Sequence, residues 1–226
     1  MSFSTTLKEL FVDKNIFFYN FGLTSFQTGV LLLASAPAIS ISLLIISSIC
    51  ASINRQDNYF LDKYNFPFLL ASIFMVINCI LITLNNKQLT PNEVSNSWIG
   101  LSNWLPFFWC FWSFQRYLYK EKLRLKTAKL LIIGTLPVLI SCFCQYFLKM
   151  YGPYRFLNNI VVWYQRPLGI ENGVTGLFNN QNYAGAWLCI ILPLCIIFLL
   201  KKYKNLLIKF LTFLLTINVV YMIILT

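Results

Sequence analysis

The sequence predicts an all-α fold, a polytopic bundle of about six or seven transmembrane helices. Hydrophobic residues make up 58% of the 226 residues and charged residues only 11%. Apolar runs of about 20 residues, the length that crosses a bilayer core, recur between short basic clusters. No polar stretch is long enough to enclose a core of its own, so we expect residues 1–226 to form a single integral membrane domain.

The N-terminal region admits two interpretations. Residues 1–15 form a short polar or interfacial lead, and residues 17–52 are apolar over more positions than one span needs. One interpretation is a single long helix that begins near Gln27. The other is a hairpin of two shorter helices, 17–34 and 38–53, which turns at Pro37 because proline cannot continue a helix from the preceding turn.

Five further spans are expected along the rest of the chain. Their bounds are 65–84, 98–114, 128–148, 183–200 and 206–225. The span at 98–114 is rich in Trp and Phe, which we expect to face lipid or to pack between helices. Pro106 and Pro137 lie inside spans, where a proline frees a carbonyl group and kinks the helix.

The basic residues orient the chain, because short cytoplasmic loops are enriched in Lys and Arg. With the N-terminal hairpin, 14 of the 18 basic residues lie on one side, whereas a single first helix divides them 12 to 6. The hairpin is the cleaner fit and predicts a cytoplasmic N-terminus. Both interpretations place the longest loop, 149–182, on the external side. With the hairpin, that side holds only Lys87, Lys149, Arg155 and Arg166.

Composition also excludes several functions. The net charge of +11 comes from loop clusters rather than from one soluble face, so the sequence predicts no nucleic-acid partner; the cluster at 116–129 instead favours lipid head groups. Histidine is absent, which excludes acid–base catalysis and metal ligation by histidine in this chain. The seven cysteines lie in apolar runs without metal-ligand spacing. We therefore expect no metal and no cofactor.

One polar stretch, residues 166–182, lies just before the span that begins near Tyr183. It combines an arginine, three glycines and a cluster of amides where unpaired polar groups are costly. One interpretation is structural, with asparagines that cap a helix and glycines that permit a tight turn. The other is an anion site, with a helix N-terminus and a bidentate phosphate contact from Arg166. Arg155 is the second candidate. The residues alone leave both interpretations open.

The same stretch resembles the signature of the O-antigen ligase and O-antigen polymerase superfamily. The resemblance is carried by Thr175-Gly-Leu-Phe-Asn-Asn-Gln-Asn-Tyr-Ala-Gly-Ala-Trp187 with Leu192-Pro193. Residues 100–109, Gln145-Tyr146 and Tyr151-Gly-Pro153 add to it, so it covers most of the chain from about residue 20.

The resemblance implies a multi-pass glycosyltransferase of the bacterial inner membrane with a GT-C-like fold when complete. Such proteins need no metal and transfer a glycan from an undecaprenyl diphosphate carrier to lipid A-core or a growing polysaccharide. The expected partners are this lipid-linked glycan diphosphate and membrane lipids, with loop 149–182 in the periplasm. External arginines of the family bind the diphosphate, and Arg166 matches them best. The expected substrate-binding residues are Arg166, Arg155, Gly176, Asn179, Asn180 and Asn182.

The chain also departs from the family pattern. Family members are longer, and their second half carries a large external loop with a catalytic histidine and further arginines. The resemblance therefore implies an N-terminal half without a catalytic residue of its own. A truncated gene, a split gene whose second chain supplies the remainder, and a degenerate relic are the alternatives. The superfamily also includes proteins described as bicarbonate-transport related, so the alternative function is a non-catalytic or transporter-like membrane protein.

Overall fold

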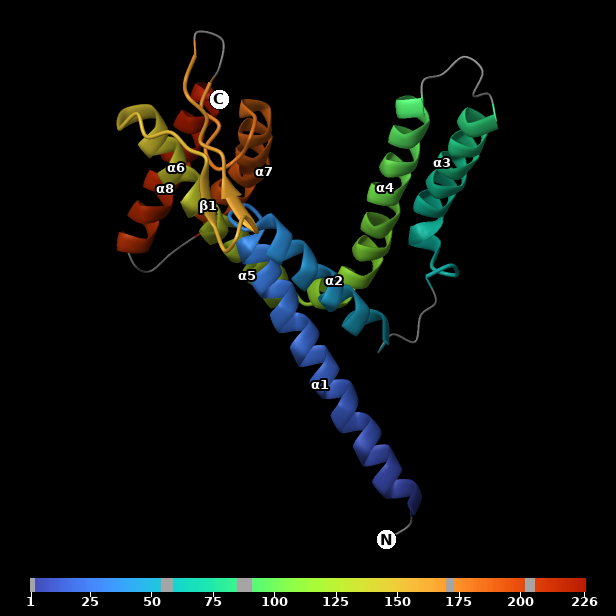
Figure 1. Ribbon diagram of the computed structural model, residues 1–226. Coiled ribbons are helices and arrows are strands. Elements are labelled where there is room, and N and C mark those ends of the chain that lie inside the picture. The colour runs from blue at the N-terminus through green and yellow to red at the C-terminus, as the bar shows by residue number, and fades with distance from the viewer. Residues whose placement is uncertain (1–2, 54–58, 85–90, 170–172, 202–205) are drawn as a thin grey trace. The chain divides into compact units, whose positions relative to one another are not determined.

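The computed structural model describes residues 3–53, 59–84, 91–169, 173–201 and 206–226, which are mostly helical (Figure 1). An all-α protein is therefore confirmed, with one small β-hairpin that the sequence did not predict. The described helices are α1 (Phe3–Leu32), α2 (Pro37–Ile53), α3 (Phe66–Leu84), α4 (Pro91–Leu118), α5 (Glu121–Gly134), α6 (Leu136–Phe147), α7 (Gln181–Leu200) and α8 (Leu206–Leu225), with a short 3-10 helix η1 (Lys63–Asn65) before α3.

Four described segments are long and apolar enough to cross a membrane. They are Lys63–Leu84, Glu121–Phe147, Gln181–Leu200 and Leu206–Leu225. Helix α2 is apolar but, at 17 residues, shorter than these segments. The four segments indicate a membrane-embedded protein, whereas the total of six or seven spans stays a prediction.

The chain breaks before Pro37, as the hairpin interpretation predicts, because α1 ends at Leu32 and α2 begins at Pro37. A single helix from Gln27 is therefore wrong. The two helices pack against each other, since the Ser40 hydroxyl donates a hydrogen bond of 2.7 Å to the carbonyl of Gly29. Helix α1 already begins at Phe3, so the polar lead belongs to it.

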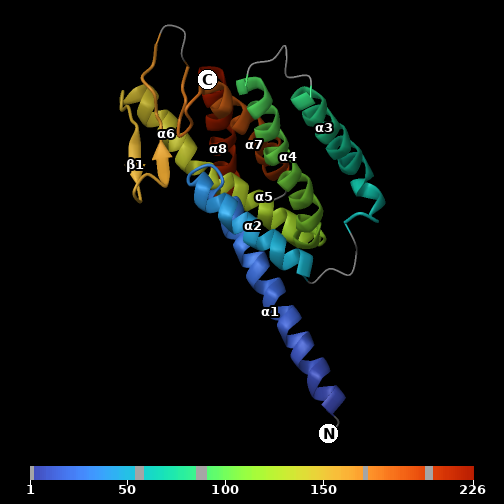
Figure 2. The ribbon, with the colours of Figure 1, turned by 45° about the vertical axis from the view of Figure 1, so that its right-hand side comes forward.

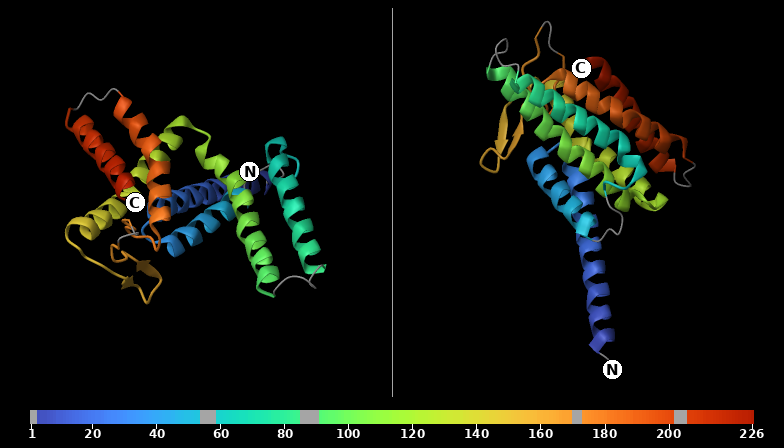
Figure 3. Two further views of the ribbon diagram at one scale, coloured as in Figure 1. Left: turned by 90° about the horizontal axis from the view of Figure 1, so that it is seen from above. Right: turned by 90° about the vertical axis from the view of Figure 1, so that its right-hand side faces the viewer.

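The chain divides into two compact units, residues 1–25 with 45–119 and residues 26–44 with 120–226. The expectation of a single domain stays a prediction. In the first unit α3 and α4 lie side by side (Figure 3). The indole N–H of Trp98 donates to the Thr83 hydroxyl at 3.0 Å, and the ring of Phe68 stacks on Phe108 at 5.2 Å between centroids. Some aromatic residues of α4 therefore pack between helices, as expected, while others, such as Trp104, are exposed.

The second unit contains the predicted proline kink. Helices α5 and α6 meet at Thr135, two residues before Pro137. Proline has no N–H to donate and its ring crowds the carbonyl four residues earlier, so a straight helix cannot continue through this point. The predicted span at 128–148 is thus two helices, and α5 extends back to Glu121 to include most of the basic cluster.

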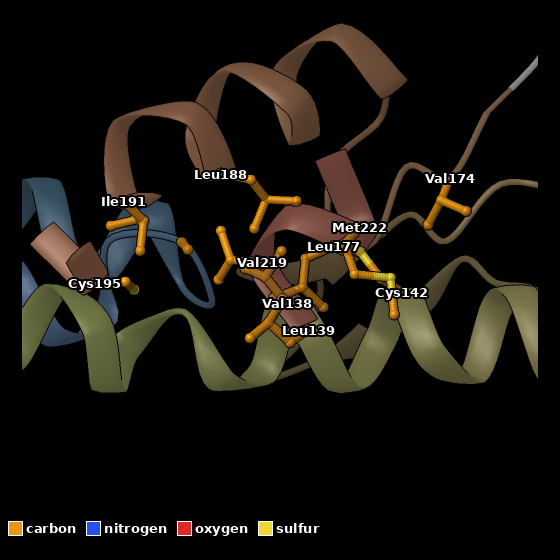
Figure 4. Close-up of a cluster of buried hydrophobic side chains, with 11 residues drawn as sticks. Val138, Leu139, Cys142, Val174, Leu177, Leu188, Ile191, Cys195, Val219 and Met222 are labelled. Atoms are coloured by element: carbon orange, nitrogen blue, oxygen red, sulfur yellow. The ribbon is translucent and has the colours of Figure 1, made fainter. Parts of the chain in front are cut away.

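The core of the second unit lies where α6, α7 and α8 meet (Figure 4). Helices α7 and α8 lie side by side (Figure 2). Leu188, Ile191 and Cys195 recur at helical spacing on the buried face of α7 and pack against α6 and α8. Lipid is as apolar as these side chains, so close packing rather than exclusion of water stabilises such contacts within a membrane. Val174 and Leu177, from the loop between α6 and α7, also pack into this core.

Candidate functional site

The loop between α6 and α7 folds back on the second unit. It forms an antiparallel hairpin of β1 (Tyr154–Phe156) and β2 (Val161–Trp163), in which Arg155 lies opposite Val162. Asn158 and Asn159 in the hairpin turn have φ of 52° and 69°, a left-handed conformation that asparagine tolerates. The indole N–H of Trp163 donates to the carbonyl of Ser35 at 2.8 Å, which ties the hairpin to the turn between α1 and α2.

The buried side chain of Gln145 in α6 makes four hydrogen bonds to the rest of the loop. Its amide N–H group donates to the carbonyl of Arg166 at 2.6 Å and to the hydroxyl of Thr175 at 3.2 Å. Its amide oxygen accepts from the backbone N–H groups of Thr175 at 3.0 Å and Gly176 at 2.9 Å. Gln145 therefore joins two loop segments that would otherwise carry unpaired polar groups beside an apolar core.

The two joined segments also bond to each other. The backbone N–H of Tyr164 donates to the carbonyl of Leu177 at 3.2 Å, and that of Gln165 to the carbonyl of Gly176 at 3.1 Å. The N–H of Arg166 donates to the hydroxyl of Thr175 at 3.1 Å. The backbone of Arg166 is thus fixed through both its N–H and its carbonyl, while its side chain is exposed.

Gly176 has a structural role at this junction. Its φ is +54°, and a Cβ placed on it would lie 2.8 Å from Sγ of Cys142. A side chain there would meet both backbone strain and the close approach of α6. The sequence places Gly176 among the substrate-binding residues. In the structure it lies beneath the loop, and its backbone N–H donates a hydrogen bond to the side-chain oxygen of Gln145.

A polar pocket of about 320 Å³ opens above this junction, at the N-terminus of α7. It is lined by Arg166, Pro167, Thr175, Asn179, Asn180, Gln181 and Asn182. Four of the six predicted binding residues, Arg166 and the three asparagines, therefore line one pocket. Arg155 does not line it and lies on β1 instead. Whether any of these residues binds a substrate stays a prediction.

The N-terminus of α7 is capped from within. Asn180 is the N-cap residue, and its side-chain oxygen accepts from the N–H of Asn182 at 2.7 Å. The N–H groups of Tyr183 and Ala184 donate to the carbonyl of Asn180 at 3.2 and 3.3 Å. The structural interpretation of the asparagine cluster thus holds for Asn180, and these three backbone N–H groups already have partners. A ligand in the pocket would be bound mainly by side chains, with the helix dipole as a background field.

Those side chains offer donors. The Thr175 hydroxyl already accepts two hydrogen bonds, from Gln145 and from the N–H of Arg166. Its own O–H group is therefore what remains to donate to a ligand. The side-chain oxygen of Gln181 accepts a hydrogen bond from the backbone N–H of Gly173. The side-chain N–H groups of Gln181 are then left as donors toward the pocket. Arg166 is the one charged residue in the described lining, which includes no carboxylate. Such a pocket suits an oxyanion better than a cation.

Gln145, Thr175 and Gln181 lie in the motifs quoted from the sequence but were not among the predicted binding residues. The sequence does contain a sign of the structural role of Gln145, because it is an isolated amide within an apolar helix, where a polar side chain needs a hydrogen-bond partner. Among the described residues, no cluster of three or more Cys, Asp or Glu side chains could hold a metal ion. The described lining holds no His, Asp or Glu side chain.

Comparison with protein-family models, with curated proteins and with solved structures found no match to this chain. The family resemblance therefore continues to depend on the residues quoted from the sequence.

Proposed function

We propose that this chain binds the diphosphate of a lipid-linked glycan in the polar pocket at the N-terminus of α7. In this proposal the chain acts as the carrier-binding part of an O-antigen ligase or polymerase in the bacterial inner membrane. The observation that carries the proposal is the convergence of Arg166, Asn179 and Asn182, all chosen from sequence, on one donor-rich pocket.

Charge complementarity gives the proposal its chemistry. A guanidinium group can donate two parallel hydrogen bonds to one phosphate, and the amides of Asn179, Gln181 and Asn182 can donate to the remaining oxygens. The helix dipole of α7 adds a favourable field for an anion at its N-terminal end. The backbone of Arg166 is already fixed by Thr175 and Gln145, which lowers the entropic cost of ordering the site on binding.

The pocket would sit on the external face if loop 149–182 is periplasmic, which the positive-inside rule predicts. A lipid carrier places its diphosphate at the membrane surface and its polyprenyl chain in hydrocarbon, so a polar pocket beside an apolar helix end matches both parts. In this proposal the group that activates the acceptor comes from outside the described lining, and the chain itself contributes recognition of the leaving diphosphate.

Binding of undecaprenyl diphosphate to the purified chain in nanodiscs tests this function. Removing a charged hydrogen-bond donor costs roughly 1.5–3 kcal/mol, so Arg166→Ala should weaken binding by about 10- to 150-fold. Arg166→Lys should lie between wild type and Arg166→Ala, because lysine keeps the charge but not the bidentate geometry.

Arg155→Ala is the matched control, since it removes the same charge from the same loop but outside the pocket. Undecaprenyl monophosphate and undecaprenol complete the ligand series and should bind progressively more weakly. Equal losses in Arg166→Ala and Arg155→Ala would mean that general surface charge attracts the carrier, and the proposed function would then be withdrawn.

A further inference from the structure

A second, apolar groove lies on the opposite half of the same unit, between α5, α7 and α8. Its volume is about 440 Å³, and aliphatic and aromatic side chains of the three helices make up most of its walls. Lys129 of α5 is the one charged residue among its described lining residues. The groove is distinct from the polar pocket, with which it shares no residue.

The groove is polar at one end and apolar at the other. Lys129 lies at the polar end, where its Nζ is 6.0 Å from the centroid of the Phe198 ring. On all three helices the lining continues away from this end toward the middle of the bundle, reaching Ile133 on α5, Cys195 on α7 and Leu215 on α8. At 1.5 Å per residue, the stretch from Ile208 to Leu215 on α8 is roughly 10 Å long.

Basic residues surround the charged end. Lys122 and Lys126 precede Lys129 by seven and three positions on α5, so the three side chains share one face of the helix. All three are exposed. Glu121, at the first turn of α5, is the one acidic residue of that helix. The local charge is therefore positive where the groove opens, and the charge distribution predicts that this side faces the cytoplasm.

We propose that this groove binds one anionic phospholipid of the cytoplasmic leaflet, with the phosphate on Lys129 and an acyl chain along Ile133, Leu211 and Leu215. A cation at the head-group level above a hydrocarbon-lined slot matches the two parts of a phospholipid, and the cytoplasmic leaflet is the one that basic segments prefer. A transmembrane helix of a partner would bury Lys129 and would need a carboxylate opposite it.

The site gives the basic face of α5 a defined function. Lys126 and Lys122 would extend the contact to the remainder of the head group, and the acyl chain would fill space between α5 and α8 that the protein leaves open. The bound lipid would thus act as a structural element that fixes α5 against the α7–α8 pair. This inference is independent of the polar pocket and of the glycan carrier.

Lipid retention by the purified chain tests the proposal. The chain is exchanged into detergent with equal amounts of phosphatidylglycerol and phosphatidylcholine, and the bound lipids are counted by native mass spectrometry. We expect one tightly retained phosphatidylglycerol. Lys129→Ala should weaken its retention about fivefold, which corresponds to the roughly 1 kcal/mol of one lysine near an anionic surface.

Lys209→Ala is the matched charge control. Lys209 follows Ile208 directly on α8 but lines a different depression, so its loss should leave retention unchanged. Thr212→Trp fills the groove and should abolish the retained lipid, whereas Leu214→Trp, on a neighbouring face of α8, should not. Equal retention of both lipids, equal losses in Lys129→Ala and Lys209→Ala, or an unchanged lipid count in Thr212→Trp would each overturn the site.

Discussion

Replacing Gln145 by leucine should destabilise the second unit more than any surface substitution, because four hydrogen bonds converge on this side chain. Leucine has a similar volume and leaves no large cavity, so the loss is almost entirely polar. It orphans the backbone N–H groups of Thr175 and Gly176, and both residues are buried. An orphaned buried donor costs roughly 1–3 kcal/mol, which gives about 2–6 kcal/mol for the pair. Loss of the hydrogen bond to the carbonyl of Arg166 adds less to the free-energy cost, because that residue is exposed.

The free energy of unfolding, measured by titration with sodium dodecyl sulfate in mixed micelles, checks this value. Gln165→Leu is the matched control, because Gln165 is also a buried glutamine of this site but its side chain makes one hydrogen bond, to the carbonyl of Ser141 at 3.2 Å. It should cost about 0.5–1.5 kcal/mol. A Gln145→Leu chain within about 0.5 kcal/mol of wild type would refute the argument that this amide holds the loop.

Three further experiments test the loop and its placement. Gly176→Ala should cost about 1–3 kcal/mol because φ is positive and a cysteine sulfur lies close, whereas Gly100→Ala, in a helix with open space around it, should be neutral or mildly stabilising; equal unfolding free energies would contradict this. Asn180→Ala should cost roughly 0.5–2 kcal/mol through loss of the α7 cap, visible as faster amide exchange in the first turn. A cysteine at Asn158 should react with a membrane-impermeant maleimide in intact cells, and one at Tyr119 only after permeabilisation; the reverse pattern would invert the predicted topology.

The presence of the helices and some of their ends were predictable because their causes are local, whereas α1 begins earlier and α4 is longer at both ends than predicted. Proline disfavours helix in the turn before it, so the breaks before α2 and between α5 and α6 lie beside Pro37 and Pro137, whereas α4 and α7 run on through Pro106 and Pro193. Asparagine is a favoured N-cap, and Asn180 takes that role with Asn182 as its partner. Apolar runs of sufficient length likewise predicted the last two spans to within about two residues.

The β-hairpin was missed because its strands are short and lack alternation over enough residues to be recognised. Arg155 and Arg166 belong to the same loop, but Arg155 lies in β1 and does not line the pocket, whereas Arg166 lines it and its backbone is fixed by Thr175. Sequence distance within a loop gives no measure of distance in space.

The sequence by itself therefore determined that this protein is helical, embedded in membrane, strongly basic, and polar at the start of α7. The tertiary structure alone decided that Gln145 meets Arg166 and Thr175, which are 21 and 30 residues further along the chain. It also decided that Arg166 and the amides share one pocket. The physical reason is that helix formation and membrane insertion depend on neighbours in sequence, whereas this site depends on which buried polar groups find partners once α6, α7 and the loop have packed.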